Sequence, residues 1–173
     1  IPLIIKGIAT HEDATLCVEH GVDAVYVSNH GGRQLDHGRG AVDVLPEVVD
    51  AVAGRAKVIV DGGFSRGTDL LKGIALGADL VVLGRLYLYG LAADGAAGIV
   101  RLLEILEDEA TVALGLTGTP SFAALTRNHL HAWGAALGLA TRDSWIVVLE
   151  DDAMPVNNFR AEAPRALAVA PTP

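Results

Sequence analysis

The 173-residue sequence has few of the features that mark secreted, membrane-spanning or nucleic-acid-binding chains. Its one cysteine, Cys17, cannot form a disulfide within the chain, and we expect this thiol to be buried in a helix. No apolar run approaches the about 20 residues that a membrane-spanning helix needs. The 13 basic residues are outnumbered by 21 acidic ones, and the net charge of −8 disfavours nucleic acid or an anionic membrane as the main partner. We expect a reducing, cytoplasmic setting and no membrane-spanning segment.

What the sequence does contain is a repeated alternation of short apolar runs and helical patterns. The apolar runs are nearly continuous, which is typical of strands buried on both faces of a parallel sheet; they cover residues 2–7, 22–29, 56–63 and 78–85. Between and after them, a helical period predicts helices over residues 12–20, 45–53, 68–76 and about 91–114. This order predicts an α/β fold, either an open parallel sheet or part of a barrel.

Polar residues follow each apolar run at the point where the strand should end. They are Lys6, Ser28–Arg33, Asp61–Gly63 and Gly84–Arg85. In barrels and open α/β sheets alike, the carboxyl ends of the strands meet at one edge, and this edge carries the site. The sequence therefore predicts one functional edge built from four strand ends.

The second of these strand ends, "SNHGGRQLD", places His30 and Arg33 on either side of two glycines. Arginine matches a carboxylate with a planar fork, and histidine is the usual general base near neutral pH. Together they suit an acid whose reactive centre is next to its carboxylate. The alternative is structural: His30 would satisfy a loop carbonyl and Arg33 would pair with Asp36.

The third and fourth strand ends, "DGGFSRG" and "LGR", suit a phosphate group. Small residues before a helix expose backbone N–H groups, and Arg66 or Arg85 can neutralise the phosphate charge. The alternative is a tight turn with a surface arginine. At the first strand end, Lys6 either stabilises negative charge on a cofactor ring or extends to solvent.

Taken together, these residues resemble the family of FMN-dependent α-hydroxy-acid oxidases and dehydrogenases, which includes glycolate oxidase, lactate oxidase and mandelate dehydrogenase. The resemblance covers about residues 1–130 through the strings "PLIIKGI", "HGVDAVYVSNHGGRQLD", "VIVDGGFSRGTDLLKGIALGAD" and "VVLGRLYLYGLAADGAAGIVRLLEILEDE". It implies a TIM barrel that carries FMN and oxidises a small 2-hydroxy acid to a 2-oxo acid.

The resemblance also implies roles for individual residues. Lys6 would stabilise reduced flavin, Ser28 would contact flavin, His30 would be the base, and Arg33 would hold the substrate carboxylate. The ribityl chain and phosphate would be bound by Asp61, Gly62, Gly63, Ser65, Arg66, Gly84 and Arg85. The family usually has arginine at the position of Ser65, so this chain departs from the pattern there.

By the same resemblance, the matched segment corresponds to the last four βα units of the barrel. We therefore expect a half barrel over residues 1–131 and an unmatched tail over residues 132–173. A half barrel exposes two strand edges, which predicts a homo-oligomer or association with a missing N-terminal half. A different FMN- or phosphate-binding barrel enzyme is a rival interpretation, against which the His30–Arg33 pair argues.

Outside the strand ends, three expectations remain. The helix-surface acids Glu104, Glu107, Asp108 and Glu109 are expected to face solvent, and the other histidines have no spacing typical of metal ligands. The tail motif "WIVVLEDDAMPVNNF" faintly resembles an acidic strand end of glycosyltransferases, where Glu150, Asp151 and Asp152 would lie near a metal-bound sugar nucleotide. A simple acidic turn is the favoured alternative.

Overall fold

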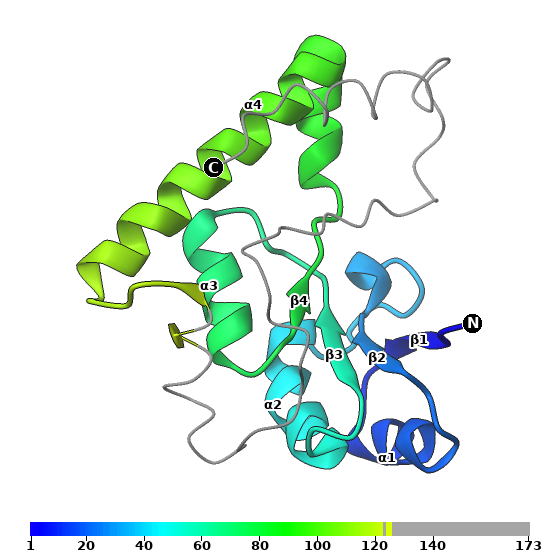
Figure 1. Ribbon diagram of the computed structural model, residues 1–173. Helices are drawn as coiled ribbons and strands as arrows, with labels where there is room; N and C mark the ends of the chain where they lie inside the picture. The colour runs from blue at the N-terminus through cyan, green and yellow to red at the C-terminus, as the bar shows by residue number, and fades with distance from the viewer. Residues whose placement is uncertain (123, 126–173) are drawn as a thin grey trace.

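A computed structural model describes residues 1–122 and 124–125, so the acidic motif at residues 150–152 lies outside the described part. The elements alternate as the sequence predicts: β1 (Ile4–Ile8), α1 (His11–Glu19), β2 (Ala24–Val27), the short 3-10 turn η1 (His30–Gly32), α2 (Ala41–Val52), β3 (Lys57–Val60), α3 (Gly67–Ala75), β4 (Leu80–Val81) and α4 (Leu86–Leu116) (Figure 1).

The four strands form one parallel sheet in the order β1-β2-β3-β4, so each strand pairs with its neighbours in sequence. In the register of β1 and β2, Lys6 faces Tyr26, and Ile8 faces Val27. The step from Lys6 to Ile8 therefore contains one extra residue, Gly7, in the manner of a β-bulge. The predicted parallel α/β fold is confirmed for the described residues.

Alternate residues of each strand face opposite sides of the sheet, as the period of two requires. Val25, Val27 and Val60 belong to the main core, in which α1, α2, α3 and α4 also take part. The other face carries a second apolar cluster of Ala24, Tyr26, Ile59 and Val82. All four residues of β2 are buried, which confirms the prediction that this strand is covered on both faces.

Two helices begin earlier than predicted. α2 begins at Ala41 instead of residue 45, directly after the extended residue Gly40, and it includes Pro46. α4 begins at Leu86, directly after Arg85, instead of about residue 91. Early starts shorten the loops at the carboxyl edge and bring the helix termini close to the strand ends.

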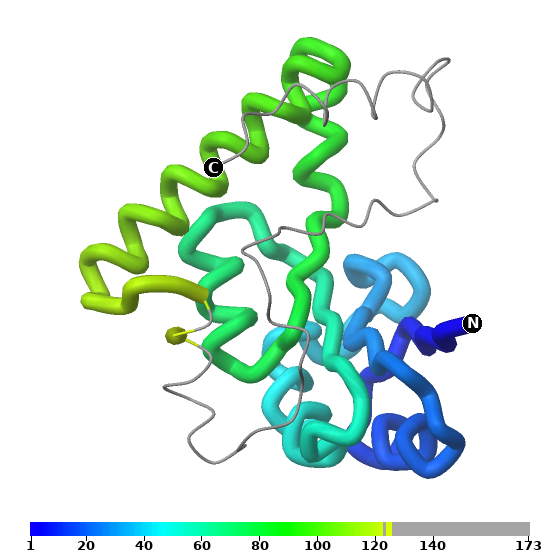
Figure 2. The backbone as a smooth tube through the Cα atoms, viewed as in Figure 1, coloured from blue at the N-terminus to red at the C-terminus, as the bar shows by residue number. Residues whose placement is uncertain are grey.

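α4 consists of two helical arms that reverse direction, as the path of the chain shows (Figure 2). The break lies at Asp94 and at Gly95, whose φ of 52° is left-handed. The arms meet at Gly90 and Gly98, where a Cβ on either residue would overlap the backbone of the other. Glycine is therefore required at this contact.

By length and composition alone, α4 is apolar enough to cross a membrane, with a mean hydropathy of 1.3. This qualifies the expectation of no membrane-spanning segment, although one such helix is weak evidence for a span. The 18-residue window with no more than two charged residues can only be 86–103, which includes the break at Asp94 and Gly95. That window is folded into two arms and is not one straight helix.

Candidate active site

Three strand ends meet around the carboxylate of Asp61, which follows β3 and has a side chain only 5% exposed. The Lys6 ammonium, from β1, lies 3.4 Å from Asp61 Oδ2. The same ammonium lies 5.2 Å from the centre of the Tyr26 ring, from β2. A buried carboxylate requires such partners, because taking an unpaired charge out of water is costly.

Tyr26 also contacts Asp61 directly, since its hydroxyl donates a hydrogen bond of 3.1 Å to Asp61 Oδ2. Burial, followed by the charge of Asp61 and this hydrogen bond, raises the pKa of Tyr26 far above its usual range. The phenol is therefore a fixed neutral donor. Asp61 Oδ1 is buried and accepts no hydrogen bond from any residue in the described part of the chain.

The loop after β2 is ordered by side chains that bind its own backbone. Ser28, which is buried, accepts a hydrogen bond of 3.2 Å from the backbone N–H of His30. Asn29 Oδ1 accepts one of 3.0 Å from Gly31 N–H, and Asn29 Nδ2 donates one of 3.3 Å to the Arg39 carbonyl. These contacts form a tight turn that ends β2 and exposes the next residues.

The turn holds three successive residues in the left-handed region: His30 at φ 54°, Gly31 at 65° and Gly32 at 76°. For a histidine this backbone is strained by about 1–3 kcal/mol, and such strain is concentrated at functional sites. The imidazole lies beside the bulge in β1, because a Cβ on Gly7 would be 3.4 Å from His30 Cε1. The bulge therefore leaves room for the ring near Lys6.

The structural alternative for this motif has little support. Asp36 accepts from the His37 backbone at 3.0 Å and lies 3.7 Å from the His37 ring. Across the described residues, no ion pair joins Arg33 to Asp36, and the His30 ring makes no hydrogen bond to a loop carbonyl. The Arg33 side chain is exposed beside the His30 turn, where a ligand can reach it.

Arg85, at the end of the fourth strand run, lies against the same turn. A Cβ on Gly31 would be 3.3 Å from Arg85 Nη2, so the guanidinium rests over the backbone of the turn. The ends of the second and fourth strand runs are thus brought together, as predicted from their polar residues. Gly84, just before Arg85, is half-buried.

Arg66, the other predicted phosphate partner, forms an ion pair with Glu109. Its Nη2 lies 2.7 Å from Glu109 Oε1 and its Nε 2.8 Å from the same oxygen, while Gly67 N–H donates to Glu109 Oε2 at 2.7 Å. The expectation that Glu109 faces solvent is therefore wrong: it joins α4 to the start of α3. No sequence pattern indicates a contact between two residues that lie 43 positions apart.

These contacts also lower the pKa of two carboxyl groups. The hydrogen bonds from the Arg66 side chain and the Gly67 backbone lower the pKa of Glu109. At Asp69, burial acts to raise the pKa but is outweighed by hydrogen bonds from the Ser65 backbone, Lys72 and the Arg66 backbone, so its pKa is lowered. Arg66 thus joins the start of α3 to α4, and the Ser65 backbone bonds Asp69 in the first turn of α3; a role for either residue in phosphate binding stays a prediction.

The two glycines after Asp61 are held in conformations that favour glycine. Gly62 has a φ of 98° and Gly63 one of 84°. A Cβ on Gly62 would lie 3.3 Å from Ala41 Cβ and 3.4 Å from Asn29 Oδ1, whereas Gly63 has open space around it. The backbone of this turn is therefore accessible at Gly63 and packed against the Asn29 loop at Gly62.

Sequence reasoning missed two residues of this site, Gly7 and Tyr26. Tyr26 stands within an apolar run, where a tyrosine is usually a core residue, and its polar partner is 35 residues away. The usable signal was period-two alternation, which puts Tyr26 on the face opposite Val25 and Val27.

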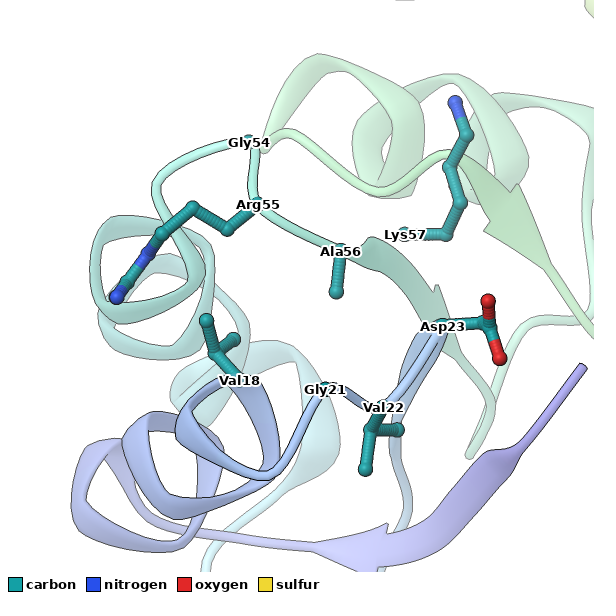
Figure 3. A pocket seen from close by; sticks show the side chains of 8 residues that line it. All are labelled: Val18, Gly21, Val22, Asp23, Gly54, Arg55, Ala56 and Lys57. Atoms are coloured by element: carbon teal, nitrogen blue, oxygen red, sulfur yellow. The ribbon is translucent and has the colours of Figure 1, made fainter.

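A separate pocket of about 390 Å³ lies at the other end of the strands (Figure 3). It is lined by Val18, Gly21, Val22, Asp23, Gly54, Arg55, Ala56 and Lys57. Its charged groups are already bound: Lys57 lies 2.7 Å from Asp79, and Asp23 accepts from the Leu3 backbone at 2.6 Å. The pocket is therefore a gap between helix ends. Residues 1–122 and 124–125 contain no cluster of three metal-ligating side chains.

Comparison with known proteins gives matches over the same part of the chain. Residues 1–132 match the family described as FMN-dependent dehydrogenase. A peroxisomal (S)-2-hydroxyacid oxidase, GLO3 of Arabidopsis thaliana, is 48% identical over 130 residues, which are 75% of this chain and 36% of that protein. An L-lactate oxidase of Nostoc sp. is 46% identical over 131 residues, which are 76% of this chain and 36% of the oxidase.

The structural neighbours agree with these relatives. The crystal structure of a mandelate oxidase with benzoyl-formic acid matches with a TM-score of 0.71 and 46% identity, over 73% of this chain and 38% of that one. A mandelate oxidase mutant with a monooxide FMN adduct matches equally, with a TM-score of 0.71. The chain thus spans little more than a third of the length of the relatives it matches.

Proposed function

The chain belongs to the FMN-dependent dehydrogenase family, and from this premise we propose that it carries the FMN- and substrate-binding edge of an enzyme that oxidises a small 2-hydroxy acid to a 2-oxo acid. The observation that carries the proposal is the convergence of Lys6, Asp61, His30 and Arg85 at one edge of the sheet. The names of its relatives, which include hydroxyacid, lactate and mandelate oxidases, support the same substrate class.

The residues present fit FMN in two respects. Asp61 Oδ1 is a buried acceptor without a hydrogen-bond donor among the described residues, and the hydroxyls of a ribityl chain are donors. The exposed backbone at Gly63 and the Arg85 guanidinium suit the phosphate, since N–H groups and a cation both favour an anion. Lys6 would lie near the flavin ring, where a positive charge favours the reduced form.

The substrate side of the reaction would fall to the His30 turn. Arg33 would bind the substrate carboxylate bidentately and so orient the carbon that carries the hydroxyl. Oxidation to the 2-oxo acid removes two electrons and two protons. His30 would accept one proton at its imidazole, and the left-handed turn would hold the ring in place for this transfer. FMN, when bound, supplies the acceptor for the two electrons and for the second proton.

We also propose that the described strands form one half of an eight-stranded barrel. Three features support this: the sequential parallel order of the sheet, the apolar cluster on the face away from the main core, and the greater length of the relatives. A self-associated dimer or a complex with the other half would pair the open edges of the sheet at β1 and β4. The boundary at residue 131 and a cytoplasmic location stay predictions; relatives from Arabidopsis thaliana and Oryza sativa carry peroxisomal names.

The test of FMN binding is a fluorescence titration of the purified chain with FMN, with the mass in solution measured alongside. We compare wild type with Arg85→Ala and with Arg101→Ala, whose guanidinium lies on α4 and pairs with Glu104 at 2.9 Å. We expect saturable binding that weakens in Arg85→Ala and not in Arg101→Ala. Binding that is equally strong in both variants would contradict the phosphate site, and a folded wild-type chain that binds no FMN would contradict the proposal for this chain.

A catalytically incomplete half barrel is the second candidate function, because Lys6, His30 and Arg33 come from only part of the full fold. Turnover of 2-hydroxy acids with an artificial electron acceptor separates the two. A chain that binds FMN without turnover would be the incomplete half barrel.

A further inference from the structure

We propose that Tyr26 is a positioning residue that fixes the Asp61 carboxylate and the Lys6 ammonium in the orientation that FMN requires. This inference rests on the proposed function and deepens it. Tyr26 is 5% exposed and is not expected to touch the substrate. It acts through the two charged groups that it contacts.

The two carboxylate oxygens of Asp61 have different surroundings. The Tyr26 hydroxyl, at 3.1 Å, and the Lys6 ammonium, at 3.4 Å, both approach Oδ2. Two donors on one oxygen fix the rotation of the carboxylate plane, and they leave Oδ1 as the oxygen available to a further donor. Within the described chain Oδ1 has no hydrogen-bond partner, and buried acceptors are usually satisfied.

The Tyr26 ring also contacts Lys6. The ammonium lies 5.2 Å from the ring centre, within the range of a cation–π interaction. The Lys6 side chain is 26% exposed, so part of it remains accessible. Tyr26 therefore binds one charged group through its hydroxyl and the other through its ring.

Paired strands hold Lys6, Tyr26 and Asp61 in fixed positions. Tyr26 lies on the central part of the sheet and faces Lys6 across the register of β1 and β2. Asp61 follows Val60, which pairs with Val27 in the register of β2 and β3. All three side chains are thus set by neighbouring paired strands, and groups on paired strands are positioned more accurately than groups on loops.

A purely structural contact would also satisfy the Tyr26 hydroxyl, so the structural and positioning roles have to be separated. A structural contact contributes to folding and leaves ligand binding unchanged. A positioning contact contributes to FMN affinity, because without it the carboxylate can rotate and Oδ1 loses its fixed direction. A structural role therefore predicts a change in stability alone, and a positioning role predicts a change in FMN affinity.

The experiment uses Tyr26→Phe, which keeps the ring and its packing and removes the hydroxyl alone. The matched control is Tyr89→Phe, because Tyr89 is 69% exposed on α4. We measure the FMN dissociation constant by flavin fluorescence and the midpoint of urea unfolding for each variant. We expect FMN binding about tenfold weaker in Tyr26→Phe, the usual effect of losing one hydrogen bond to a charged group, and no change in Tyr89→Phe.

A double variant isolates the contact itself. In an Asp61→Ala background, the additional change Tyr26→Phe should weaken FMN binding by less than about twofold, because the side chain through which the Tyr26 hydroxyl acts is already absent. Asp61→Asn retains an acceptor for Tyr26, and so it tests the carboxylate even if Tyr26→Phe fails to fold. FMN binding by Asp61→Asn as tight as that of wild type would overturn the inference.

The remaining outcomes distinguish this inference from the proposed function. If wild type binds FMN and Tyr26→Phe binds it equally well, the positioning role is overturned and the proposed function stands. If the folded wild-type chain binds no FMN, both are overturned. A weaker affinity in Tyr26→Phe with an unchanged unfolding midpoint supports the positioning role directly.

Discussion

The two ends of the strands carry similar charged residues and use them differently. At the amino ends, Asp79 uses both oxygens: Lys57 Nζ lies 2.7 Å from one, and the Val58 backbone N–H donates to the other at 2.8 Å. Arg55 donates to the carbonyls of Val52 and Ala51 at the end of α2. Each of these charged groups is bound by its immediate surroundings.

At the carboxyl ends, the corresponding groups are incompletely bound. Asp61 has one oxygen bonded to Tyr26 and Lys6 and one with no partner in the described chain. His30 is held in a left-handed conformation. An aspartate near a lysine therefore does not by itself mark a site. What distinguishes the edge proposed to bind FMN is the left-handed backbone at His30 and an aspartate oxygen that no described residue bonds.

The largest expected effect concerns how the carboxyl edge is held by α4. A Cβ on Gly67 would lie 2.5 Å from both Ala110 N and Leu106 O, which are backbone atoms of α4. Gly67→Ala should therefore force α3 and α4 apart and lower the free energy of unfolding by about 3 kcal/mol. Urea unfolding measures this. Its counterpart at the amino edge, Gly21→Ala, meets no atom within 4 Å and should cost only the strain of its positive φ, about 1 kcal/mol.

A smaller loss of unfolding free energy is expected from a substitution at the amino edge. Asp79→Ala removes the acceptor of Lys57 and of the Val58 backbone N–H. Both side chains of the ion pair are 35% exposed, so we expect a loss of about 1–2 kcal/mol in unfolding free energy. FMN affinity should stay unchanged. A fall in FMN affinity in this variant, with the chain still folded, would contradict the proposal that FMN is bound at the carboxyl edge alone.

Gly62→Ala tests the turn after Asp61. The new alanine would have to adopt a φ of 98°, and its Cβ would contact Ala41 and Asn29. We expect about 1 kcal/mol of lost stability from the backbone strain, and weaker FMN binding because Asp61 and the Asn29 loop shift together. Gly21→Ala, with a φ of 72° and open space at the opposite edge, serves as the control for strain without contact. Equal FMN affinities in the two variants would show that the contact is irrelevant.

The smallest effect is the pH dependence of the Arg66–Glu109 pair. Hydrogen bonds from Arg66 and Gly67 lower the pKa of Glu109 in the folded state below its unfolded value of about 4.3. A lowered carboxyl pKa stabilises the folded state above the unfolded value, and this contribution is lost as the pH falls through the folded pKa. The unfolding midpoint of Arg66→Gln should therefore lie slightly below that of wild type at pH 7. The difference should disappear in acid, and a difference that grew in acid would contradict this account.

Much of this arrangement could be predicted from the sequence, because strand ends are marked by abrupt changes from apolar to polar residues. That signal located Lys6, the His30 turn and Asp61 at one edge. It could not reveal the hydrogen bond from Tyr26 to Asp61 or the ion pair between Arg66 and Glu109. Both contacts join residues that are distant in sequence and meet only when the chain is folded. The break in α4 was also missed, because Asp94 and Gly95 stand within a pattern that otherwise continues as a helix.

The most direct test of the central claim compares two isosteric changes, Asp61→Asn and Asp79→Asn, in one fluorescence titration with FMN. Both replace an aspartate that a lysine contacts, one at each end of the strands. We predict that Asp61→Asn weakens FMN binding by about tenfold or more, and that Asp79→Asn binds FMN as wild type does. Equal affinities in the two folded variants would contradict the claim that the carboxyl edge holds the cofactor through Asp61.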